Sequence, residues 1–275
     1  MIDCIQRKKT KQLTNETTST ATRTRSYGWR PDLPDPRDHV LLTPRPPKGG
    51  LPLGVDLRGR FPAVYDQGQL GSCTGNAIGA AVAFHVCSRD GLGAWTPSRL
   101  FIYYNERVLE HTVRIDAGAE IRDGIKSVAK LGCPSEDLWP YSDAVPGRFT
   151  KKPTKAVFAA ATQHEASSYQ RVPRTLLAMK SCLANAFPFV FGFTVFESFE
   201  SEEVAKTGVV PMPDGGKPLG GHAVTCVGYD DATQRFIVRN SWGKDWGDKG
   251  YFTMPYEYLL NENLSDDFWT IRAVT

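Results

Sequence analysis

The sequence predicts an α+β fold with two lobes, and three observations lead to this prediction. The chain has 275 residues, 41% hydrophobic and 23% charged, which is enough for a sizeable core. Apolar residues repeat at helical spacing mainly in the first half of the body, whereas β-prone runs separated by turn residues occupy the second half. Segregation of helices from strands is typical of α+β proteins, so we expect a helical lobe and a strand-rich lobe.

Four helices are expected before Phe187, where the pattern changes to strands. The run from Cys73 to Cys87 is small or apolar on nearly all sides, which predicts a buried helix with Ser72 as its N-cap and an end at Arg89-Asp90-Gly91. A second helix should follow Thr96-Pro97-Ser98, with the proline at its first position. Apolar stripes predict two further helices, at residues 120–131 and 172–183.

Five strands are expected in the second half, where aromatic and β-branched residues form short runs. Turn residues such as Asp214-Gly-Gly and Asp230-Asp231 separate these runs. The predicted strands are residues 187–196, 223–229, 235–238, 250–254 and 268–274.

The N-terminal region differs in composition from the rest of the chain. Residues 1–26 are polar and basic, cannot bury a core and are predicted to be disordered. Residues 27–50 are proline-rich, which favours an extended strap on the surface. The strap could limit access to a site, as a short prosegment would, or it could simply be a tether. The body is expected at residues 51–275, with lobes at about 64–165 and 166–275.

Charge and motif content narrow the function classes. The net charge of +3 is concentrated in residues 1–50, which carry ten Lys or Arg and five Asp or Glu, so the body gives no electrostatic case for a nucleic-acid partner. There is no apolar stretch of about 18 residues for a membrane span and no apolar core of a secretory signal. Localisation stays open, because secretion by another route would look the same. The six cysteines and five histidines show no zinc-site spacing, so no metal is expected.

One cysteine has the surroundings that a nucleophile needs. Cys73 lies where a loop containing Gly68 and Gly71 enters the first helix, and a helix N-terminus favours a thiolate. His222 follows two glycines at the start of a strand, and Asn240 ends the next strand, where its side chain could hold the tautomer of a histidine. These residues together suggest nucleophilic catalysis by a thiol.

Three segments resemble motifs of the papain-like cysteine peptidases. The stretch from Gln67 to Cys73 resembles Q-G-x-x-G-S-C, residues 221–229 resemble the histidine strand, and residues 240–251 resemble N-S-W-G-x-x-W-G-x-x-G-Y. The resemblance covers residues 51–275. The strap around residues 29–38 is similar to that of bacterial and viral members with short N-terminal segments.

This resemblance implies a two-lobed papain-like fold, with a helical lobe, an antiparallel β-barrel-like lobe and an active-site cleft between them. It implies hydrolysis of peptide bonds through a thioester, with no cofactor. Cys73 would be the nucleophile, His222 the acid and base, Asn240 the residue that orients His222, and Gln67 a donor to the oxyanion. Trp242 would cover the Asn–His bond and line part of the substrate site.

The resemblance also implies a specificity pocket and partners. Gly118, Ala119, Glu120 and Ile121 match the stretch that pairs with the substrate backbone and borders the main pocket, and Gly221 would line the same pocket. The partner would be a peptide or protein substrate, and the protein is expected to be a monomer that engages neither nucleic acid nor a membrane.

The sequence departs from the family pattern and leaves alternatives. Thr74 and Asn76 stand where many members have Trp and Phe, and Leu70 replaces a cysteine that is often disulfide-bonded. The alternatives are an acyl transferase or peptide ligase on the same scaffold, a non-catalytic binding protein, and a transglutaminase-like enzyme. The presence of Cys73, His222, Asn240 and Gln67 argues against a non-catalytic binding protein. Asn240 in place of an aspartate, and the lack of an evident calcium loop, argue against a transglutaminase-like enzyme.

Overall fold

The computed structural model describes residues 26–41, 45–91 and 95–275. Apart from Ser26, the predicted tail of residues 1–26 lies outside the described residues. The helices are α1 (Cys73–Asp90), α2 (Arg99–Leu109), α3 (Ile121–Leu131), α4 (Lys155–Ala161), α5 (Leu176–Ala184), α6 (Glu202–Thr207) and α7 (Tyr256–Leu260). The strands are β1 (Gly54–Asp56), β2 (Ala166–Arg171), β3 (Phe189–Phe196), β4 (Pro218–Asp230), β5 (Arg235–Arg239), β6 (Tyr251–Pro255) and β7 (Ser265–Val274).

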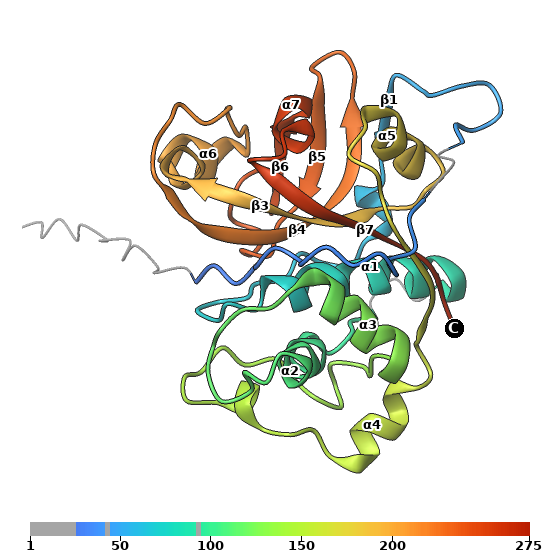
Figure 1. Ribbon diagram of the computed structural model, residues 1–275, viewed down its shortest axis with the longest axis vertical. Helices are drawn as coiled ribbons and strands as arrows, with labels where there is room; N and C mark the ends of the chain where they lie inside the picture. Colours follow the sequence, from blue (N-terminus) through green and yellow to red (C-terminus); the bar gives the residue numbers. More distant parts are fainter. Residues whose placement is uncertain (1–25, 42–44, 92–94) are drawn as a thin grey trace, which may run out of the picture.

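The elements form two lobes, so the predicted two-lobed α+β fold is confirmed. Figure 1 shows α2, α3 and α4 on one side, the sheet with α6 and α7 on the other, and α1 between them. The sheet is antiparallel in the order β2-β7-β3-β4-β5-β6, and β1 pairs with β4. Within the described residues no strand pairing joins β2 to β6, so the sheet is open and not a closed barrel.

Helix α1 is the central packing element. Its side chains are buried on nearly all sides, as the sequence predicts, because it packs against α2 and α3 and also against β4 and β7. Thr225 on β4 donates its hydroxyl to the Ala77 carbonyl at 3.0 Å, which fixes the helix to the sheet. The helix begins at Cys73 and ends at Asp90, and it is followed by Gly91, which has a left-handed φ of 65°. The N-terminal turn of α1 therefore has a fixed position at the boundary between the lobes.

Several element predictions were wrong in detail. The second helix is capped by Ser98, whose side chain accepts from the Phe101 amide, and Pro97 lies before the helix and not at its first position. Ser72 is the N-cap residue of α1, as expected, but its hydroxyl contacts the Tyr141 hydroxyl at 2.6 Å and makes no capping hydrogen bond. The predicted helix at residues 172–183 begins only at Leu176, after Thr175 caps it.

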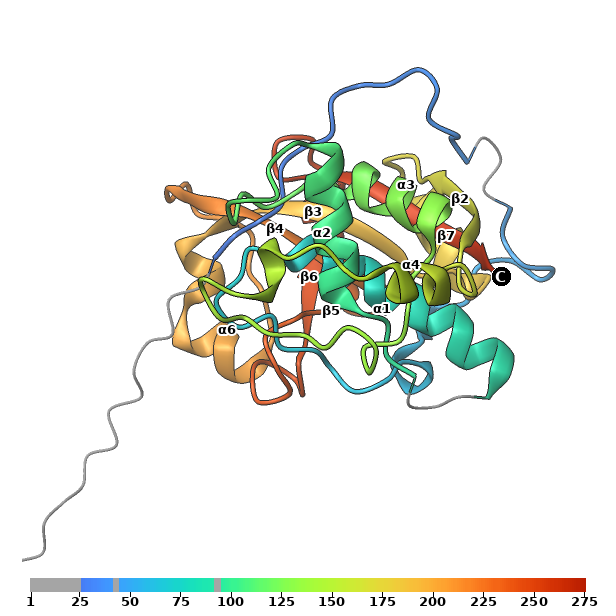
Figure 2. The same ribbon diagram turned by 90° about the horizontal axis from the view of Figure 1, so that it is seen from below.

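A long N-terminal segment runs along the boundary between the lobes. In Figure 1 and Figure 2 it is the blue chain that crosses from one end of the molecule to the other, beside α1, α3 and β7. Trp29 forms a parallel bridge with Ala119, and Val40 forms one with Arg171. Residues 26–41, called the strap from here on, comprise Ser26 and the first part of the segment predicted at 27–50, and they are extended and paired with both lobes at intervals.

Candidate active site

Cys73 is the first residue of α1, and its side chain is fully buried. Burial raises the pKa of its thiol to about 12, and the charge of Glu106 acts in the same direction, whereas backbone interactions at Ala223 and Gly28 oppose the rise. Burial of this kind favours the neutral thiol over the thiolate. Ala223 directly follows His222 on β4, so the two lobes bring the thiol and the histidine strand together.

His222 and Asn240 are hydrogen-bonded across neighbouring strands. Nε2 of His222 lies 2.8 Å from Oδ1 of Asn240, which also accepts from the Ser241 amide at 2.8 Å. Because an amide oxygen can only accept, Nε2 carries the proton of this bond and Nδ1 is the nitrogen that can exchange one. The Trp242 ring lies 5.0 Å from the imidazole, centroid to centroid, and is nearly buried. This packing excludes water from the histidine–asparagine bond.

The side chain of Gln67 is held in one orientation. Its Oε1 accepts from the Ser241 hydroxyl at 2.7 Å, which leaves Nε2 to donate to the Leu70 carbonyl at 2.9 Å and the Ser26 carbonyl at 3.3 Å. The amide group therefore faces the strap. The Ser26 carbonyl oxygen of the strap already accepts one of the hydrogen bonds that Nε2 can donate.

The pocket residues expected from the sequence line the path of the strap. The Ala119 amide donates to the Gly28 carbonyl at 2.7 Å, and its carbonyl accepts from the Arg30 amide at 3.1 Å. Gly221 on β4 accepts from the Trp29 amide at 2.9 Å. The neighbouring residues Gly118, Glu120 and Ile121 form the turn into α3: Gly118 has a φ of 68°, Glu120 is the N-cap and Ile121 is buried.

Sequence reasoning missed the strap residues that contact the site. A Cβ added to Gly28 would lie 1.7 Å from the Gly71 carbonyl oxygen, so the strap backbone is in direct contact with the loop before Cys73. The Tyr27 ring lies 6.4 Å from the His222 ring and its hydroxyl is bonded to Glu200. Two aromatic residues within a proline-rich segment were the available signal, but nothing in the sequence indicated which surface they would meet.

A buried acidic cluster near the strap was also missed. Asp32 of the strap and Asp267 of β7 have fully buried carboxylates, and Arg171 reaches both, at 3.4 and 2.8 Å. Burial and the neighbouring Asp32 charge raise the pKa of Asp267, although the hydrogen bond from the Asp32 amide and the charge of Arg171 act in the opposite direction. Positions this far apart in the sequence carry no spacing pattern, so only the fold reveals the cluster.

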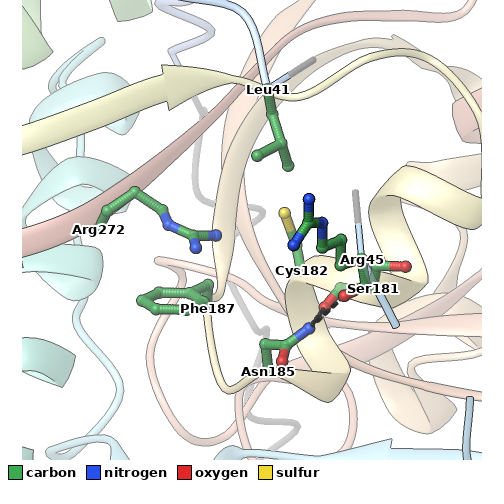
Figure 3. Close-up of a pocket in the computed structure, with 7 residues that line it drawn as sticks. All are labelled: Leu41, Arg45, Ser181, Cys182, Asn185, Phe187 and Arg272. Atoms are coloured by element: carbon green, nitrogen blue, oxygen red, sulfur yellow. Dashed lines mark hydrogen bonds between the residues drawn. The ribbon is translucent and has the colours of Figure 1, made fainter. Parts of the chain in front are cut away.

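A separate cavity of about 220 Å³ lies at the other end of the strap (Figure 3). Leu41, Arg45 and Arg272 are among the residues that line it, and none of the candidate catalytic residues do. The Asn185 amide donates to the Arg45 carbonyl at 2.9 Å. The N-terminal region is thus attached to the body at this end as well as at the lobe boundary.

The described residues also bear on metal binding and membrane spanning. Within residues 26–41, 45–91 and 95–275, no group of three or more His, Cys, Asp or Glu side chains is placed to hold a metal ion. In the same described part of the chain, no helix has the length and apolar character needed to cross a membrane.

The fold and the site define a class of protein. Residues 51–264 match the papain family of cysteine proteases, so the chain belongs to this family. It is a cysteine protease, and its substrates are therefore peptides or proteins.

Particular relatives agree with this assignment. The structure is similar to that of xylellain, a cysteine protease from Xylella fastidiosa, with a TM-score of 0.84 and 43% identity over 93% of this chain and 100% of that one. An uncharacterized peptidase C1-like protein of Acanthamoeba polyphaga mimivirus is 40% identical over 93% of this chain and 89% of the relative. A cathepsin B-like protein of Giardia intestinalis is 32% identical over 70% of this chain and 64% of its own length.

Proposed function

We propose that Cys73, His222, Asn240 and Gln67 carry out peptide-bond hydrolysis in this protease. The observation that carries the proposal is the 2.8 Å bond between His222 Nε2 and Asn240 Oδ1, next to a β4 backbone that contacts the Cys73 thiol. The bond fixes the imidazole tautomer, and α1 supplies partial positive charge at the sulfur. No other described cysteine begins a helix beside a histidine: the remaining ones are buried in the interior.

The reaction follows from these positions. Nδ1 of His222 takes the thiol proton, and the thiolate of Cys73 attacks the carbonyl carbon of the scissile bond. His222 then gives the proton to the leaving amine, the C–N bond breaks, and a thioester remains. Water loses a proton to His222 as it attacks the thioester carbon. The C–S bond then breaks, the acyl group is released as a carboxylic acid, and His222 returns the proton to the Cys73 thiolate.

Gln67 would stabilise the charge that develops on the substrate oxygen. Its Nε2 donors are aimed by the Ser241 hydroxyl bond to Oε1, so they need no reorganisation during the reaction. In the present arrangement the Ser26 carbonyl receives one of these donors. The substrate carbonyl would replace it, with the Cys73 backbone amide as the second donor.

The strap would therefore close the substrate cleft. Gly28, Trp29 and Arg30 use the backbone groups of Ala119 and Gly221 that a substrate would use, and they cover the thiol. A buried, protonated thiol is a poor nucleophile. We thus assign residues 27–50 the role of a built-in inhibitory segment, in preference to a tether.

Labelling with an epoxide-type inhibitor of thiol peptidases tests the nucleophile. The full chain and its Trp29→Ala variant are treated, and the modified residue is mapped by mass spectrometry. We expect modification of Cys73 only, and none in a Cys73→Ala chain. Modification at Cys182 or Cys226 instead would contradict the assignment.

A pair of asparagine variants tests the orienting role. Asn240→Ala removes the hydrogen bond to His222 and should lower kcat by roughly 100-fold, because a buried bond to a group that becomes charged contributes up to about 3 kcal/mol. Asn263→Ala, at an exposed position, is the control and should leave kcat unchanged. An unchanged kcat in Asn240→Ala would remove Asn240 from the mechanism.

The closing role of the strap has its own test. Trp29→Ala should raise both kcat/KM and the labelling rate of Cys73, because it removes the main side-chain anchor of the strap. Leu33→Ala is the matched control, since Leu33 belongs to the strap but is 74% exposed. Equal rates in the wild type and Trp29→Ala chains would leave the strap as a tether only.

A further inference from the structure

The carboxylate of Asp116 holds the loop that leads into Cys73. The Gly71 amide, two residues before the nucleophile, donates to Oδ1 of Asp116 at 3.1 Å and to Oδ2 at 2.9 Å. A backbone N–H makes a stronger hydrogen bond to a carboxylate than to a neutral acceptor. Residues 67–72 belong to no helix or strand, so the position of this loop depends on contacts of this kind.

The second partner of Asp116 lies on helix α2. The Tyr103 hydroxyl donates to Oδ1 of Asp116 and accepts from the Gly118 amide at 3.2 Å. The Tyr103 side chain is fully buried, which fixes the position of its hydroxyl. Gly118 directly precedes Ala119, whose amide and carbonyl are bonded to the strap. A chain of hydrogen bonds therefore joins the loop before Cys73 to the backbone groups that a substrate would use.

Apolar packing supports the same connection. Leu70, which stands where many papain-like peptidases have a disulfide-bonded cysteine, is fully buried and belongs to the same apolar cluster as Tyr103 and Ala119. A Cβ added to Gly71 would lie 3.4 Å from Oδ1 of Asp116, so the loop and the carboxylate are in close contact. The cysteines within the described residues are free, so hydrogen bonds and packing hold the loop in place of a covalent bridge.

The loop carries both groups that we assign to the oxyanion. Gln67 begins the loop and supplies the side-chain donor, and the residue that follows the loop, Cys73, supplies the backbone donor. Such donors stabilise a transition state only when they are already aimed at the oxygen that becomes charged. A misplacement of about 1 Å can lower the rate by about 100-fold. A residue that fixes the loop would therefore control the reaction without touching the substrate.

We infer that Asp116 is a positioning residue for hydrolysis, and that its carboxylate fixes the oxyanion donors of Gln67 and Cys73 relative to the substrate-binding backbone of Ala119. This inference rests on the proposed function, because the donors belong to that site. It predicts that Asp116 affects the steps in which an oxyanion forms. Reactions of the Cys73 thiol that form no oxyanion should be insensitive to Asp116.

Steady-state kinetics of Asp116 variants test this role. All chains carry Trp29→Ala, so that closure by the strap does not mask the effect. Asp116→Ala should lower kcat roughly tenfold with KM changed less than about twofold, because the loop loses the hydrogen bond at Gly71. Asp116→Asn keeps one acceptor oxygen and should restore kcat to within roughly threefold of the parent. An unchanged kcat in Asp116→Ala would overturn the inference.

Asp245→Asn is the matched control. Its side chain is 91% exposed and lies near only the exposed Lys244, so this change removes a carboxylate without disturbing the site. The kcat and the Tm of this variant should equal those of the Trp29→Ala parent. A loss of kcat as large as that of Asp116→Ala would show that the effect is not specific to Asp116 and would overturn the inference.

Two reactions of the thiol separate positioning from a general loss of structure. Iodoacetamide forms an S–C bond with Cys73 and releases iodide, and no oxyanion develops, so its rate in Asp116→Ala should stay within about twofold of the parent. A peptide aldehyde adds to the thiol, and its carbonyl oxygen takes the place of the oxyanion, so its Ki should rise roughly tenfold. Equal losses in kcat, alkylation rate and Tm would indicate a purely structural role and would overturn the inference.

Failure of the proposed function would give a different result. The Trp29→Ala parent would then cleave no peptide, or would be modified elsewhere than at Cys73, whichever residue stands at position 116. A parent that cleaves peptides and is modified at Cys73, with an Asp116→Ala variant equal to it in kcat and in aldehyde affinity, would overturn the positioning role alone.

Discussion

At the scale of single residues, Glu106 is a buried acid directly beneath the first turn of α1. Its Oε2 accepts from the Thr74 hydroxyl at 2.7 Å, and its Oε1 has no hydrogen-bond partner within the described residues. Burial raises its pKa to about 8, with a smaller contribution from the Glu110 charge. Thr74, which departs from the usual family residue, is thus the polar partner that this buried acid requires.

The shifted pKa of Glu106 predicts a pH dependence of stability. Between pH 4.5 and 8 the folded protein retains the proton of Glu106 while the unfolded chain releases it, so the free energy of unfolding falls as the pH rises through this window. Glu106→Gln should reduce the slope by about 1.4 kcal/mol per pH unit, the value for one proton. Urea denaturation of both chains from pH 4.5 to 8 measures this, and identical slopes would contradict it.

Residue-scale reasoning from the sequence was strongest where chemistry depends on neighbours in the chain. Gln67, Cys73, His222 and Asn240 each lie within a short motif, so their order and spacing could be read directly. Asp267 has no such motif. Its burial and its hydrogen bond from the amide of Asp32, which is 235 positions away, emerge only in the folded chain.

At the scale of elements, the close approach of the strap to α1 depends on one glycine. Gly28 lies against the loop that leads into α1, and a Cβ there would lie 1.7 Å from the Gly71 carbonyl oxygen. Gly28→Ala should therefore displace the strap from Cys73. If the change weakens closure by about 1.4 kcal/mol, the open fraction and the alkylation rate of the Cys73 thiol rise roughly tenfold.

Thiol alkylation by iodoacetamide, followed over time at neutral pH, measures this effect. Gly59→Ala is a suitable control, because its surroundings are open. If Gly28→Ala alkylates no faster than the wild type, the strap does not limit access to the thiol at this point.

Elements with a strong apolar pattern were predictable and those without one were not. Helices α1 and α3 and strand β3 appear near their expected bounds, because their side chains face the core continuously or at regular spacing. Helix α4 and strand β2 were not expected. Strand β2 is largely polar and partly exposed, and α4 has only seven residues, so neither presents a clear period.

At the scale of the whole molecule, paired charges hold the strap to the body. The Asp38 carboxylate of the strap accepts hydrogen bonds from two nitrogens of Arg122 on α3, and both side chains are nearly buried. Asp38→Asn should lower the free energy of unfolding by about 2 kcal/mol, because Arg122 keeps only the more distant Asp32 as a partner. Asp35→Asn is the control: Asp35 pairs with the exposed Arg37 at 2.7 Å and, at 3.6 Å, with the partly exposed Lys126 of α3, so its removal should cost much less than that of Asp38.

Chemical denaturation of the full chain measures the two variants side by side. Limited proteolysis adds a local readout, since a strap released from α3 should be cut sooner in Asp38→Asn than in Asp35→Asn. Equal stability and equal cutting would indicate that the strap is held by its backbone contacts alone.

The two-lobed architecture could be predicted because helical and strand patterns occupy different halves of the sequence. The seating of the strap could not, since its proline content predicts only that it is extended. Its course depends on the indole of Trp29, which occupies space left by Gly192 on β3 and Gly221 on β4. Both strands come much later in the chain than the strap.

Because the strap is part of the same polypeptide as Cys73, its occupancy of the site is a unimolecular equilibrium. Dilution cannot release it, and a substrate must compete with a ligand whose effective concentration is set by the tether and not by the solution. The same covalent link makes release permanent once the chain is cut after the strap, since the freed segment then disperses. Cleavage of a single peptide bond would thus convert an inhibition that does not depend on concentration into one that dilution removes.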